Sequence, residues 1–487
     1  PANKKLKKFV DLQHDVTARD VVQAHTEGFV SIEHMKRYTT LGMATDQGKT
    51  SGINGMAIMA QQRKMPLPKV GTTTFRPPYT PVALGALGGR ETGRHFQPER
   101  LSPMHDNHIK AGAKITQTGL WQRAWYYPNP GEKVGDAYRR EAHAVRNSVG
   151  ITDISTLGKI DVQGPDAAEF LNRVYVNGWK KLAIGKSRYG IMLRDDGYVL
   201  DDGTTSRLSE DHFFMTTTTA NAGKVLSHMQ FLLETDWPDL RVHVTSSTEQ
   251  WAGMAIAGPK SRALLQSLNS DIDFSRDDLP PMGFRPGKIE GCPVRVSRIS
   301  FSGELAFEVY TPAGFGAELW SQIIEKGEEI NLVPYGTEAL GTLRIEKGHV
   351  AGPELDGRTT LVDMGLGKMA STKKTFVGNV LCNRPGLVDS KRPTLVGLQP
   401  IKQNEKLLSG TILFPNEPNP KGHGQGHVSS VTYSPALGHY IALGFLQDGS
   451  TRIGETILAV NALRDEQIAV DVVSPHFYDP EGDRTNA

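Results

Sequence analysis

The sequence has little cysteine, no long apolar run and almost no net charge. Its two cysteines, Cys292 and Cys382, are too few and too far apart for a disulfide framework or a four-ligand zinc site. No apolar run approaches the ~20 residues that a membrane-spanning helix needs. Because 55 Lys and Arg are balanced by 53 Asp and Glu, the formal charge of +2 cannot hold a nucleic-acid backbone. We therefore expect no metal, no membrane and no nucleic acid, and expect small molecules or other proteins as partners.

The composition is typical of a soluble globular protein. Hydrophobic residues make up 38% of the 487 residues. At ~150 residues per domain, this length predicts about three domains. The first residue, Pro1, is followed by lysines and by no apolar signal-peptide core, so we expect no export and a cytoplasmic location. A start at proline without methionine is also typical of a fragment or a processed piece.

Residues 1–118, which we call the docking segment, differ from the rest of the chain. A short helical stretch at residues 21–37 precedes loops dense in Gly, Thr and Pro, such as GMATDQGKTSG (residues 42–52) and GTTTFRPPYTP (residues 71–81). Too little of the segment is periodic to bury a core of its own. We therefore expect it to lie on another surface, of this chain or of a partner.

Two apparent ligand motifs have simpler explanations. Gly48-Lys49-Thr50 lacks the glycine spacing and the preceding strand of a phosphate-binding loop, and Gly85, Gly88 and Gly89 follow no predicted strand. His423 and His427 have no carboxylate or thiol at a supporting spacing and indicate a hairpin loop. We expect neither a dinucleotide-binding domain nor a metal site from these residues.

Residues 119–385 contain a weak internal repeat. KIDVQGPDAAEFLNRV (residues 159–174) predicts a strand, a Gly-Pro junction and a helix, and MAIAGPKSRALLQSL (residues 254–268) repeats that plan. Two such units indicate two ferredoxin-like α+β halves. In the remaining residues, 386–487, short strands separated by Gly, Pro and Asn predict a small antiparallel barrel or sandwich; we place them at residues 394–398, 428–433, 441–446 and 468–473.

The adjacent acids Asp201 and Asp202 form the first candidate functional feature. They follow the apolar Val199 and Leu200, at or just past a core-facing strand. Two adjacent carboxylates repel each other and cost stability unless water or a ligand engages them. The alternative is a polar turn, because Asp-Gly pairs populate turns.

Glu308 is the second candidate. In GELAFEVY, strict alternation puts Leu305, Phe307 and Val309 on one face and places Glu308 with Ala306 and Tyr310 on the other. A carboxylate between a small residue and an aromatic ring suits a flat heterocycle that offers N–H donors. The alternative is a solvated outer face.

Longer strings resemble two known families. YTTLGMATDQGKTS (residues 38–51), PMHDNHIKAGA (residues 103–113) and GLWQRAWYYPNPGE (residues 119–132) closely resemble the C-terminal half of the alpha subunit of heterotetrameric sarcosine oxidase. ITDISTLGKIDVQGPDAAEFLNRV (residues 151–174) and FSGELAFEVY (residues 301–310) resemble the folate-binding fold of the glycine-cleavage aminomethyltransferase, or T-protein. The resemblance implies an α+β fold of two ferredoxin-like halves and a C-terminal antiparallel β-barrel, preceded by the irregular docking segment.

The resemblance also implies cofactors and partners. In the sarcosine oxidase family a beta subunit carries FAD and a covalently attached FMN, the FMN lies against the alpha subunit, and an N-terminal half of the alpha subunit binds NAD. Only the folate-binding half is present here. We therefore expect tetrahydrofolate on this chain, FMN at the interface with a beta-type flavoprotein partner, FAD in that partner and no NAD. The chain would be a truncated alpha subunit or one product of a split gene, in a hetero-oligomer with smaller subunits.

Carried over residue by residue, the resemblance names candidate site residues. The catalytic acid falls on Asp202, beside the reactive folate nitrogens, and the pteridine-binding carboxylate falls on Glu308. Tyr189 matches a folate-lining tyrosine, and Asn221 lies near a ligand-lining strand end. The chain departs from the family where the T-protein has an arginine and a tyrosine, which fall here on Leu340 and Phe301. The missing arginine argues against a lipoyl-linked aminomethyl substrate.

Three functions are compatible with these expectations. In the first, a flavin in the partner oxidises sarcosine (N-methylglycine), and this chain captures the resulting iminium to form 5,10-methylenetetrahydrofolate. In the second, the chain is a non-catalytic scaffold whose docking segment closes over the partner's FMN, using hydroxyl and guanidinium groups that suit phosphate or flavin carbonyl contacts, namely Thr72, Thr73, Thr74 and Arg76. The alternative for these four residues is a turn-rich linker. The third function is a stand-alone aminomethyltransferase, which the docking segment and the missing arginine disfavour.

Overall fold

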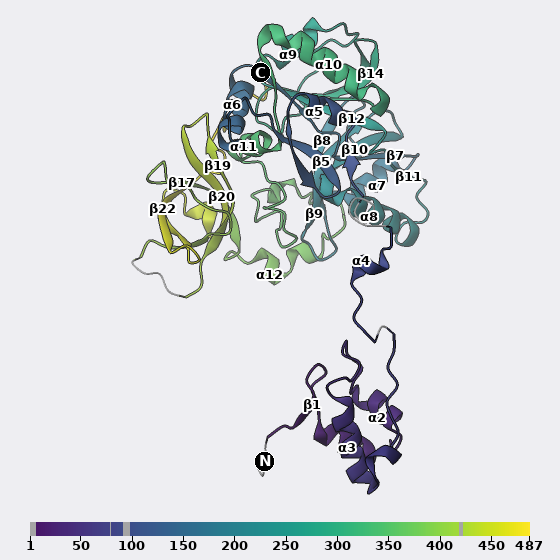
Figure 1. The fold of residues 1–487 in the computed structure, drawn as a ribbon. Coiled ribbons are helices and arrows are strands. Elements are labelled where there is room, and N and C mark those ends of the chain that lie inside the picture. Colours follow the sequence, from purple (N-terminus) through teal and green to yellow (C-terminus); the bar gives the residue numbers. More distant parts are fainter. Residues whose placement is uncertain (1–5, 78, 91–97, 418–421) are drawn as a thin grey trace. The chain divides into compact units, whose positions relative to one another are not determined.

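The computed structural model describes residues 6–77, 79–90, 98–417 and 422–487, and the chain divides into two compact units. The units are Pro1–Pro98 and Glu99–Ala487 (Figure 1). Residues 99–118, expected in the docking segment, belong to the second unit, because β3 (Arg100–Leu101) and β4 (Lys114–Thr118) both pair with β5 (Trp121–Tyr126). Within the described ranges, no helix combines the length and the apolar character needed to cross a membrane.

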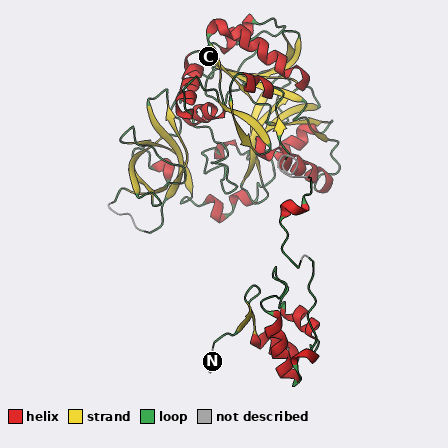
Figure 2. Ribbon diagram, viewed as in Figure 1, coloured by secondary structure: helices red, strands yellow, loops and turns green. Residues whose placement is uncertain are grey.

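The N-terminal unit is mainly helical (Figure 2). It contains β1 (Phe9–Asp11), β2 (Val16–Thr17), α1 (Ala18–Thr26), α2 (Ile32–Thr39), α3 (Gly52–Arg63) and α4 (Leu84–Leu87). Apolar side chains from the first three helices and their connections form a buried cluster that includes Val21, Met35, Leu41, Met59 and Val70. The expectation that this segment buries no core of its own is therefore wrong. Its apolar residues are spread over short helices, so no single stretch shows a long period.

One sheet of the second unit, which we call the β9 sheet, has the strand order β11-β7-β10-β9-β8. Its strands are β7 (Gly158–Gln163), β8 (Ser187–Leu193), β9 (Val199–Arg207), β10 (His212–Thr217) and β11 (His243–Ser246). Helices α7 (Ala167–Val174) and α8 (Ala222–Thr235) cover one of its faces and bury Phe170, Val174 and Met229 against Val162 and Phe213.

A second sheet, the β15 sheet, has the order β13-β14-β15-β12-β6-β16. Its strands are β6 (Val149–Asp153), β12 (Trp251–Ala257), β13 (Phe284–Ile289), β14 (Cys292–Ser297), β15 (Ala306–Pro312) and β16 (Leu332–Pro334). Helices α5 (His105–Lys110), α9 (Ser261–Ser267) and α10 (Gly316–Gly327) lie near it, and Leu264, Leu319 and Ile323 share a core with Phe307 and Val309. Helices α6 (Val134–Asn147) and α11 (Thr337–Lys347) pack on each other beside β6.

The predicted repeat is confirmed: both copies form a strand, a Gly-Pro junction and a helix, and each copy belongs to a different sheet. Strand β7 leads through Gly164-Pro165 into α7, and β12 leads through Gly258-Pro259 into α9. Each helix packs on the sheet of its own strand. The second unit thus contains two α+β halves, as the sequence predicts.

The C-terminal part forms a closed barrel, which confirms the predicted antiparallel architecture (Figure 1). The strand order β17-β20-β19-β18-β21-β22 places Leu398, Leu413, Ala442 and Val470 in a common core. The barrel strands are β17 (Pro393–Pro400), β18 (Ile412–Pro415), β19 (Gly426–Ser434), β20 (His439–Gln447), β21 (Thr456–Asn461) and β22 (Glu466–Val473), and α12 (Pro385–Val388) precedes them. The sequence did not predict β18 or β21. Strand β18 pairs with β19 at His427, so this histidine lies in a strand and not in the expected hairpin loop, whereas His423 lies between the two strands.

Candidate functional site

Strand β9 places its two adjacent acids on opposite faces of the β9 sheet. Asp202 lies opposite Ile191 of β8, and its Oδ2 accepts a hydrogen bond of 2.8 Å from the hydroxyl of Tyr189. Asp201 points to the other face, where its oxygens accept hydrogen bonds from Thr218 Oγ1 at 2.6 Å, Thr218 N at 3.1 Å and Asn221 Nδ2 at 3.0 Å. Both acids are in a strand and are engaged by donors, so the polar-turn interpretation does not describe them.

Burial changes the protonation of this pair. It raises the pKa of Asp201 to about 7, with the charge of Asp202 adding to the effect and the hydrogen bonds opposing it. Burial also raises the pKa of Asp202, and the Tyr189 hydroxyl bond opposes this shift. The pKa of Tyr189 is raised by burial and by the neighbouring Asp202 charge, so its hydroxyl stays protonated and donates. Asp202 therefore holds a proton more readily than an ordinary aspartate does.

Gly203, the residue after Asp202, fits a position that has no room for a side chain. A Cβ atom there would lie 2.0 Å from the carbonyl oxygen of Thr216 on β10. In β8, Gly190 lies opposite Gly203. Because the clash would be with backbone, no larger residue fits this position without moving one of the strands.

Strand β15 presents Glu308 as the alternation predicts. Leu305, Phe307 and Val309 belong to the core of the β15 sheet, which confirms that Glu308 is on the opposite face. The Tyr310 hydroxyl donates a hydrogen bond of 2.8 Å to Glu308 Oε2. Burial raises the pKa of Glu308 to about 7, and the bond from Tyr310 opposes the rise. Glu308 is half-buried rather than on a solvated outer face.

The faces that carry Asp202 and Glu308 are turned toward each other. The Phe214 ring of β10 lies 5.3 Å from the Tyr310 ring, measured between centroids. Ser206 Oγ, on the same face of β9 as Asp202, is 3.5 Å from Ser297 Oγ, and Ser297 pairs with Glu308 across β14 and β15. We call the group Tyr189, Asp202, Glu308 and Tyr310 the inter-sheet site. It presents two carboxylates, each bound by a tyrosine hydroxyl, from opposing sheets.

The structure does not bring every candidate residue into this group. Asn221 donates to Asp201 and to the carbonyl oxygen of Leu200, at 3.0 and 3.2 Å, on the helix-covered face of the β9 sheet. Thr72, Thr73, Thr74 and Arg76 belong to the other compact unit. Their main chain is held by hydrogen bonds, including that from Arg76 N to Gln47 Oε1 at 2.8 Å and one from Thr74 N to Glu33. The side chains of Thr72, Thr74 and Arg76 are exposed.

The two positions that depart from the family have clear environments. Leu340 is in α11 and packs with Tyr138, Tyr335 and Leu343 in a small apolar cluster. Phe301 is 40% exposed, and its carbonyl oxygen lies 3.0 Å from His349 Nδ1. The rings of Phe301 and His349 are 5.7 Å apart. Neither position supplies a charged group to the inter-sheet site.

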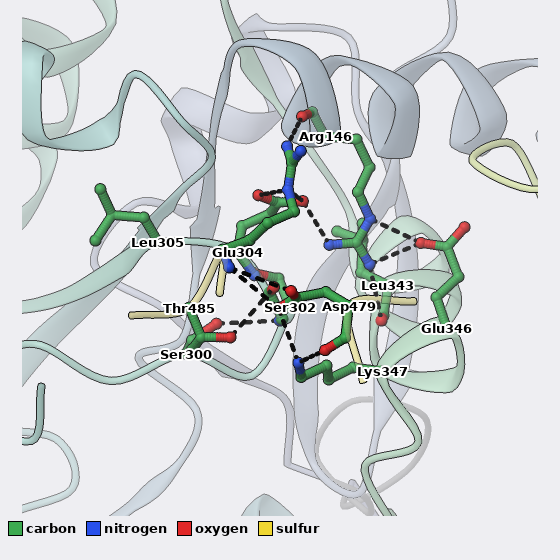
Figure 3. A network of polar contacts seen from close by, with 12 residues as sticks. Arg146, Ser300, Ser302, Glu304, Leu305, Leu343, Glu346, Lys347, Asp479 and Thr485 are labelled. Atoms are coloured by element: carbon green, nitrogen blue, oxygen red, sulfur yellow. Dashed lines mark hydrogen bonds and ion pairs between the residues drawn. The ribbon is translucent and has the colours of Figure 1, made fainter. Parts of the chain in front are cut away.

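A buried ionic network supports the loop that leads into β15 (Figure 3). Arg146 of α6 lies between Glu304, at 2.9 Å, and Glu346 of α11, at 2.7 Å. Arg484, near the end of the chain, also pairs with Glu304 at 2.8 Å. Arg146 Nη2 further donates to the carbonyl oxygen of Leu343 at 3.2 Å, and its guanidinium stacks 4.1 Å from the Tyr478 ring. Glu304 is four residues before Glu308, so this network holds the start of the strand that carries the site.

The sequence interpretation missed two contributions to the site. The hydroxyl bond from Tyr310 to Glu308 had a signal, because both residues share a face in GELAFEVY. The role of Arg146 had no signal in the sequence, because its partner Glu346 is 200 residues away. Only the folded arrangement of α6 and α11 brings these two charges together.

Comparisons with known families agree with this architecture. The family described as "GCVT N-terminal domain" matches residues 104–374, which include the inter-sheet site. The "Glycine cleavage T-protein C-terminal barrel domain" matches residues 394–479, and the "Sarcosine oxidase A3 domain" matches residues 5–90. The two compact units thus correspond to different family assignments.

Similar proteins cover the chain almost completely. Sarcosine oxidase subunit alpha of Rhizobium meliloti (strain 1021) is 46% identical over 98% of this chain and 49% of that protein, and the subunit of Corynebacterium sp. (strain U-96) is 44% identical over 98% and 50%. The chain therefore spans about half the length of these curated relatives. An aminomethyltransferase of Corynebacterium aurimucosum is 31% identical over 71% of this chain and 89% of its own length.

A solved structure supports the fold. The aminomethyltransferase T of the Bartonella henselae glycine cleavage system covers 78% of this chain and 98% of its own chain, with a TM-score of 0.67 and 24% sequence identity. At that identity the likeness concerns the fold alone. Together with the matched residues 104–374 and the aminomethyltransferase relative, it leads to one conclusion: the chain belongs to the GCVT family of the glycine-cleavage T-protein, here joined to a sarcosine oxidase A3 domain.

Proposed function

We propose that this chain is the folate-binding part of a sarcosine oxidase-type complex and captures the iminium that flavin-dependent oxidation of sarcosine produces. The product would be 5,10-methylenetetrahydrofolate. In this proposal FMN lies at the interface with a beta-type flavoprotein partner, which also carries FAD. The similarity to sarcosine oxidase alpha subunits over 98% of the chain supports the proposal.

The observation that carries the proposal is Glu308, whose Oε2 is bound by the Tyr310 hydroxyl and which faces the opposing sheet. This acceptor fits a reduced pteridine, because a carboxylate accepts hydrogen bonds from adjacent ring N–H groups. Ala255, directly opposite Glu308 on β12, is a small residue, so no large side chain faces the carboxylate from that strand. The Tyr310 hydroxyl orients the carboxylate before any ligand binds.

Asp202 would act at the reacting nitrogens. Its raised pKa allows it to hold the proton that a folate nitrogen loses when that nitrogen bonds to the iminium carbon. The same proton would then be available to the departing amine. Tyr189 positions Asp202 through its hydroxyl bond. Capture must exclude water, because water attack on the iminium would yield formaldehyde and amine instead.

Binding of the reduced folate is the first test. A hollow of about 640 Å³ on this unit is lined by Glu169, Trp237 and Lys374. It contains none of the four residues of the inter-sheet site, so we do not assign the folate to it. We expect equilibrium dialysis to show tetrahydrofolate bound to the isolated chain, which should be colourless and should not oxidise sarcosine. A chain that retains its fold but does not bind tetrahydrofolate would contradict the proposal.

A second candidate function is a scaffold that closes over the partner's FMN. The observation that favours it is the exposed Thr72–Arg76 loop on a unit that has a core of its own. Such a unit can present hydroxyl and guanidinium groups to a phosphate or a flavin carbonyl without help from the folate-binding fold. If the partner's FMN reduction depends on this loop while tetrahydrofolate does not bind, the scaffold function is the better description.

A further inference from the structure

A polar hollow lies at another edge of the space between the two sheets. Its volume is about 270 Å³, and we call it the edge pocket. Residues of both sheets line it, among them Asp161, His212, His243, Ser247, Trp251 and Arg295. The volume is just below the ~300–1,000 Å³ typical of pockets for drug-sized ligands, so it suits a small molecule.

Arg295 of β14 provides the positive charge of the edge pocket. Its guanidinium stacks on the Trp251 ring at 4.0 Å and lies 4.9 Å from the Phe214 ring. Its Nη1 is buried and makes no hydrogen bond within the part of the chain that the structure describes. Burial lowers the pKa of Arg295. The group nevertheless stays charged, because the ordinary pKa of an arginine is very high. A buried guanidinium N–H without an acceptor costs free energy, which an incoming carboxylate would recover.

Asp161 of β7 provides the negative charge beside it. Its Oδ1 is 2.5 Å from His212 Nε2 and 3.6 Å from Arg295 Nη1, an ion pair too long for a hydrogen bond. Burial acts to raise the pKa of Asp161, but hydrogen bonds and the charges of Arg295 and His212 hold it below the ordinary value. The pocket therefore presents a carboxylate and a guanidinium side by side, in an ion pair that leaves the Arg295 Nη1 N–H without a hydrogen bond.

This pocket is separate from the inter-sheet site. Arg295 pairs directly with Tyr310 across β14 and β15, whereas Glu308 pairs with Ser297 two residues further along the strands. Tyr310, whose ring meets the Phe214 ring edge to face, is thus next to Arg295, and Glu308 is the next residue of β15 on the same face. A ligand in the edge pocket would not occupy the position of the proposed pteridine.

We propose that the edge pocket binds a small α-amino acid as its zwitterion, with the carboxylate at Arg295 and the ammonium at Asp161. A simple anion would meet the Asp161 carboxylate, and a simple cation would meet the Arg295 guanidinium. A ligand that carries both charges on adjacent carbons satisfies both groups and adds no net charge to a partly buried site. The proposal concerns a second site and does not rest on folate chemistry.

Calorimetric titration of the full chain with glycine tests the proposal, with acetate and methylamine as single-charge probes. A charged hydrogen bond contributes enough that each single-charge probe should bind at least ~10-fold more weakly than glycine. The absence of glycine binding at millimolar concentration would overturn the proposal. Acetate binding as tight as that of glycine would also overturn it, because the pocket would then accept carboxylates alone.

Variants locate the bound amino acid. Arg295→Gln and Asp161→Asn should each weaken glycine binding at least ~10-fold, and Arg295→Lys should restore part of the loss because it keeps the charge. Arg241→Gln, at an exposed arginine, is the matched control. Glu308→Gln should leave glycine binding unchanged, which separates this site from the proposed folate site. If Arg295→Gln does not fold, the assignment is tested with Asp161→Asn, which retains the arginine that stacks on Trp251. Glycine binding unchanged in folded Asp161→Asn would contradict the assignment.

Discussion

The inter-sheet site and the loop of residues 72–76 hold their functional groups in opposite ways. In the inter-sheet site, strands fix the backbone, and tyrosine hydroxyls bind the side chains of Asp202 and Glu308. In the loop, hydrogen bonds hold the main chain of Thr74 and Arg76 and leave their side chains exposed. The difference teaches that a substitution between the sheets changes the site itself, whereas one in the loop changes only what the loop can contact outside.

The largest expected effect is at Asp202. In a complex reconstituted with the flavoprotein partner, Asp202→Ala should bind tetrahydrofolate with little loss but lower formation of methylenetetrahydrofolate by ~10²- to 10⁴-fold, with formaldehyde released instead. A formaldehyde assay and product chromatography measure the division. Asp196→Ala, an exposed acid in the turn before β9, is the control and should behave as the parent. Full product yield from Asp202→Ala would make Asp202 a structural residue only.

The buried network below β15 should contribute to stability more than any exposed ion pair. Arg146→Met leaves Glu346 buried with its charge poorly compensated and should lower the free energy of unfolding of the second unit by about 3–5 kcal/mol. Arg140→Met, on the same helix, removes the half-exposed pair with Glu132 and should cost at most about 1 kcal/mol. Urea unfolding followed by circular dichroism compares the two variants. Equal losses of unfolding free energy in the two variants would mean that burial does not make the Arg146 network more stabilising than an exposed ion pair.

Removal of the Glu308 charge should nearly abolish folate binding at micromolar concentrations. Glu308→Gln places an amide N–H₂ against a pteridine donor, and an unpaired buried donor costs on the order of 2–4 kcal/mol, or ~30- to 1,000-fold in affinity. Calorimetric titration with tetrahydrofolate measures the loss. Glu325→Gln, at an exposed position of α10, is the matched control. Folate binding by Glu308→Gln as tight as that of the parent would remove the site assignment.

A smaller effect concerns pH. Because burial raises the pKa of Glu308 to about 7, its carboxylate is lost as the pH falls through that value, and folate affinity should fall by about tenfold per pH unit below it. The Tyr310 hydroxyl favours the charged form, so Tyr310→Phe should move the midpoint to higher pH and cost about 1 kcal/mol of binding at neutral pH. Titrations from pH 6 to 9 test the direction. A midpoint that moves to lower pH in Tyr310→Phe would contradict the role of the hydroxyl bond.

The smallest effect on the isolated chain is expected in the loop. Thr73→Ala combined with Arg76→Ala should change unfolding by at most about 0.5 kcal/mol, because most surface substitutions do so, and should leave folate binding intact. It should nevertheless weaken assembly with, or flavin reduction in, the beta-type partner. Gel filtration with the partner and flavin reduction kinetics give the readout. Unchanged assembly and unchanged kinetics would remove the reason for placing FMN at this loop.

The sequence predicted those features that depend on local period. Alternation in β15 placed Glu308 on the face opposite Phe307, and the Gly-Pro junctions indicated the two α+β halves. The barrel was predicted from its longer strands, while β18, with four residues, is too short to show a clear alternation. These successes follow from contacts between residues that are near each other in sequence.

Features that depend on distant contacts could not be predicted. The side on which Asn221 lies depends on how α8 meets the β9 sheet, and the pairing of Arg146 with Glu346 depends on the packing of α6 against α11. The core of the N-terminal unit combines single residues such as Val21, Met35 and Met59 from three helices. No window of the sequence contains such a pattern, so only the fold reveals it.

Strand β9 contains two pairs of identical adjacent residues, and these pairs affect how the register between β9 and its neighbouring strands is fixed. Asp201-Asp202 and Thr204-Thr205 place like residues on both faces, so a slip by one residue would exchange one aspartate for the other at the inter-sheet site with little change in polarity. These pairs therefore cannot specify which aspartate faces Glu308. Gly203 can, because a slip would bring a residue with a side chain against the Thr216 carbonyl oxygen, where a Cβ would lie 2.0 Å away. A residue without a side chain thus selects which of two identical acids is available for chemistry.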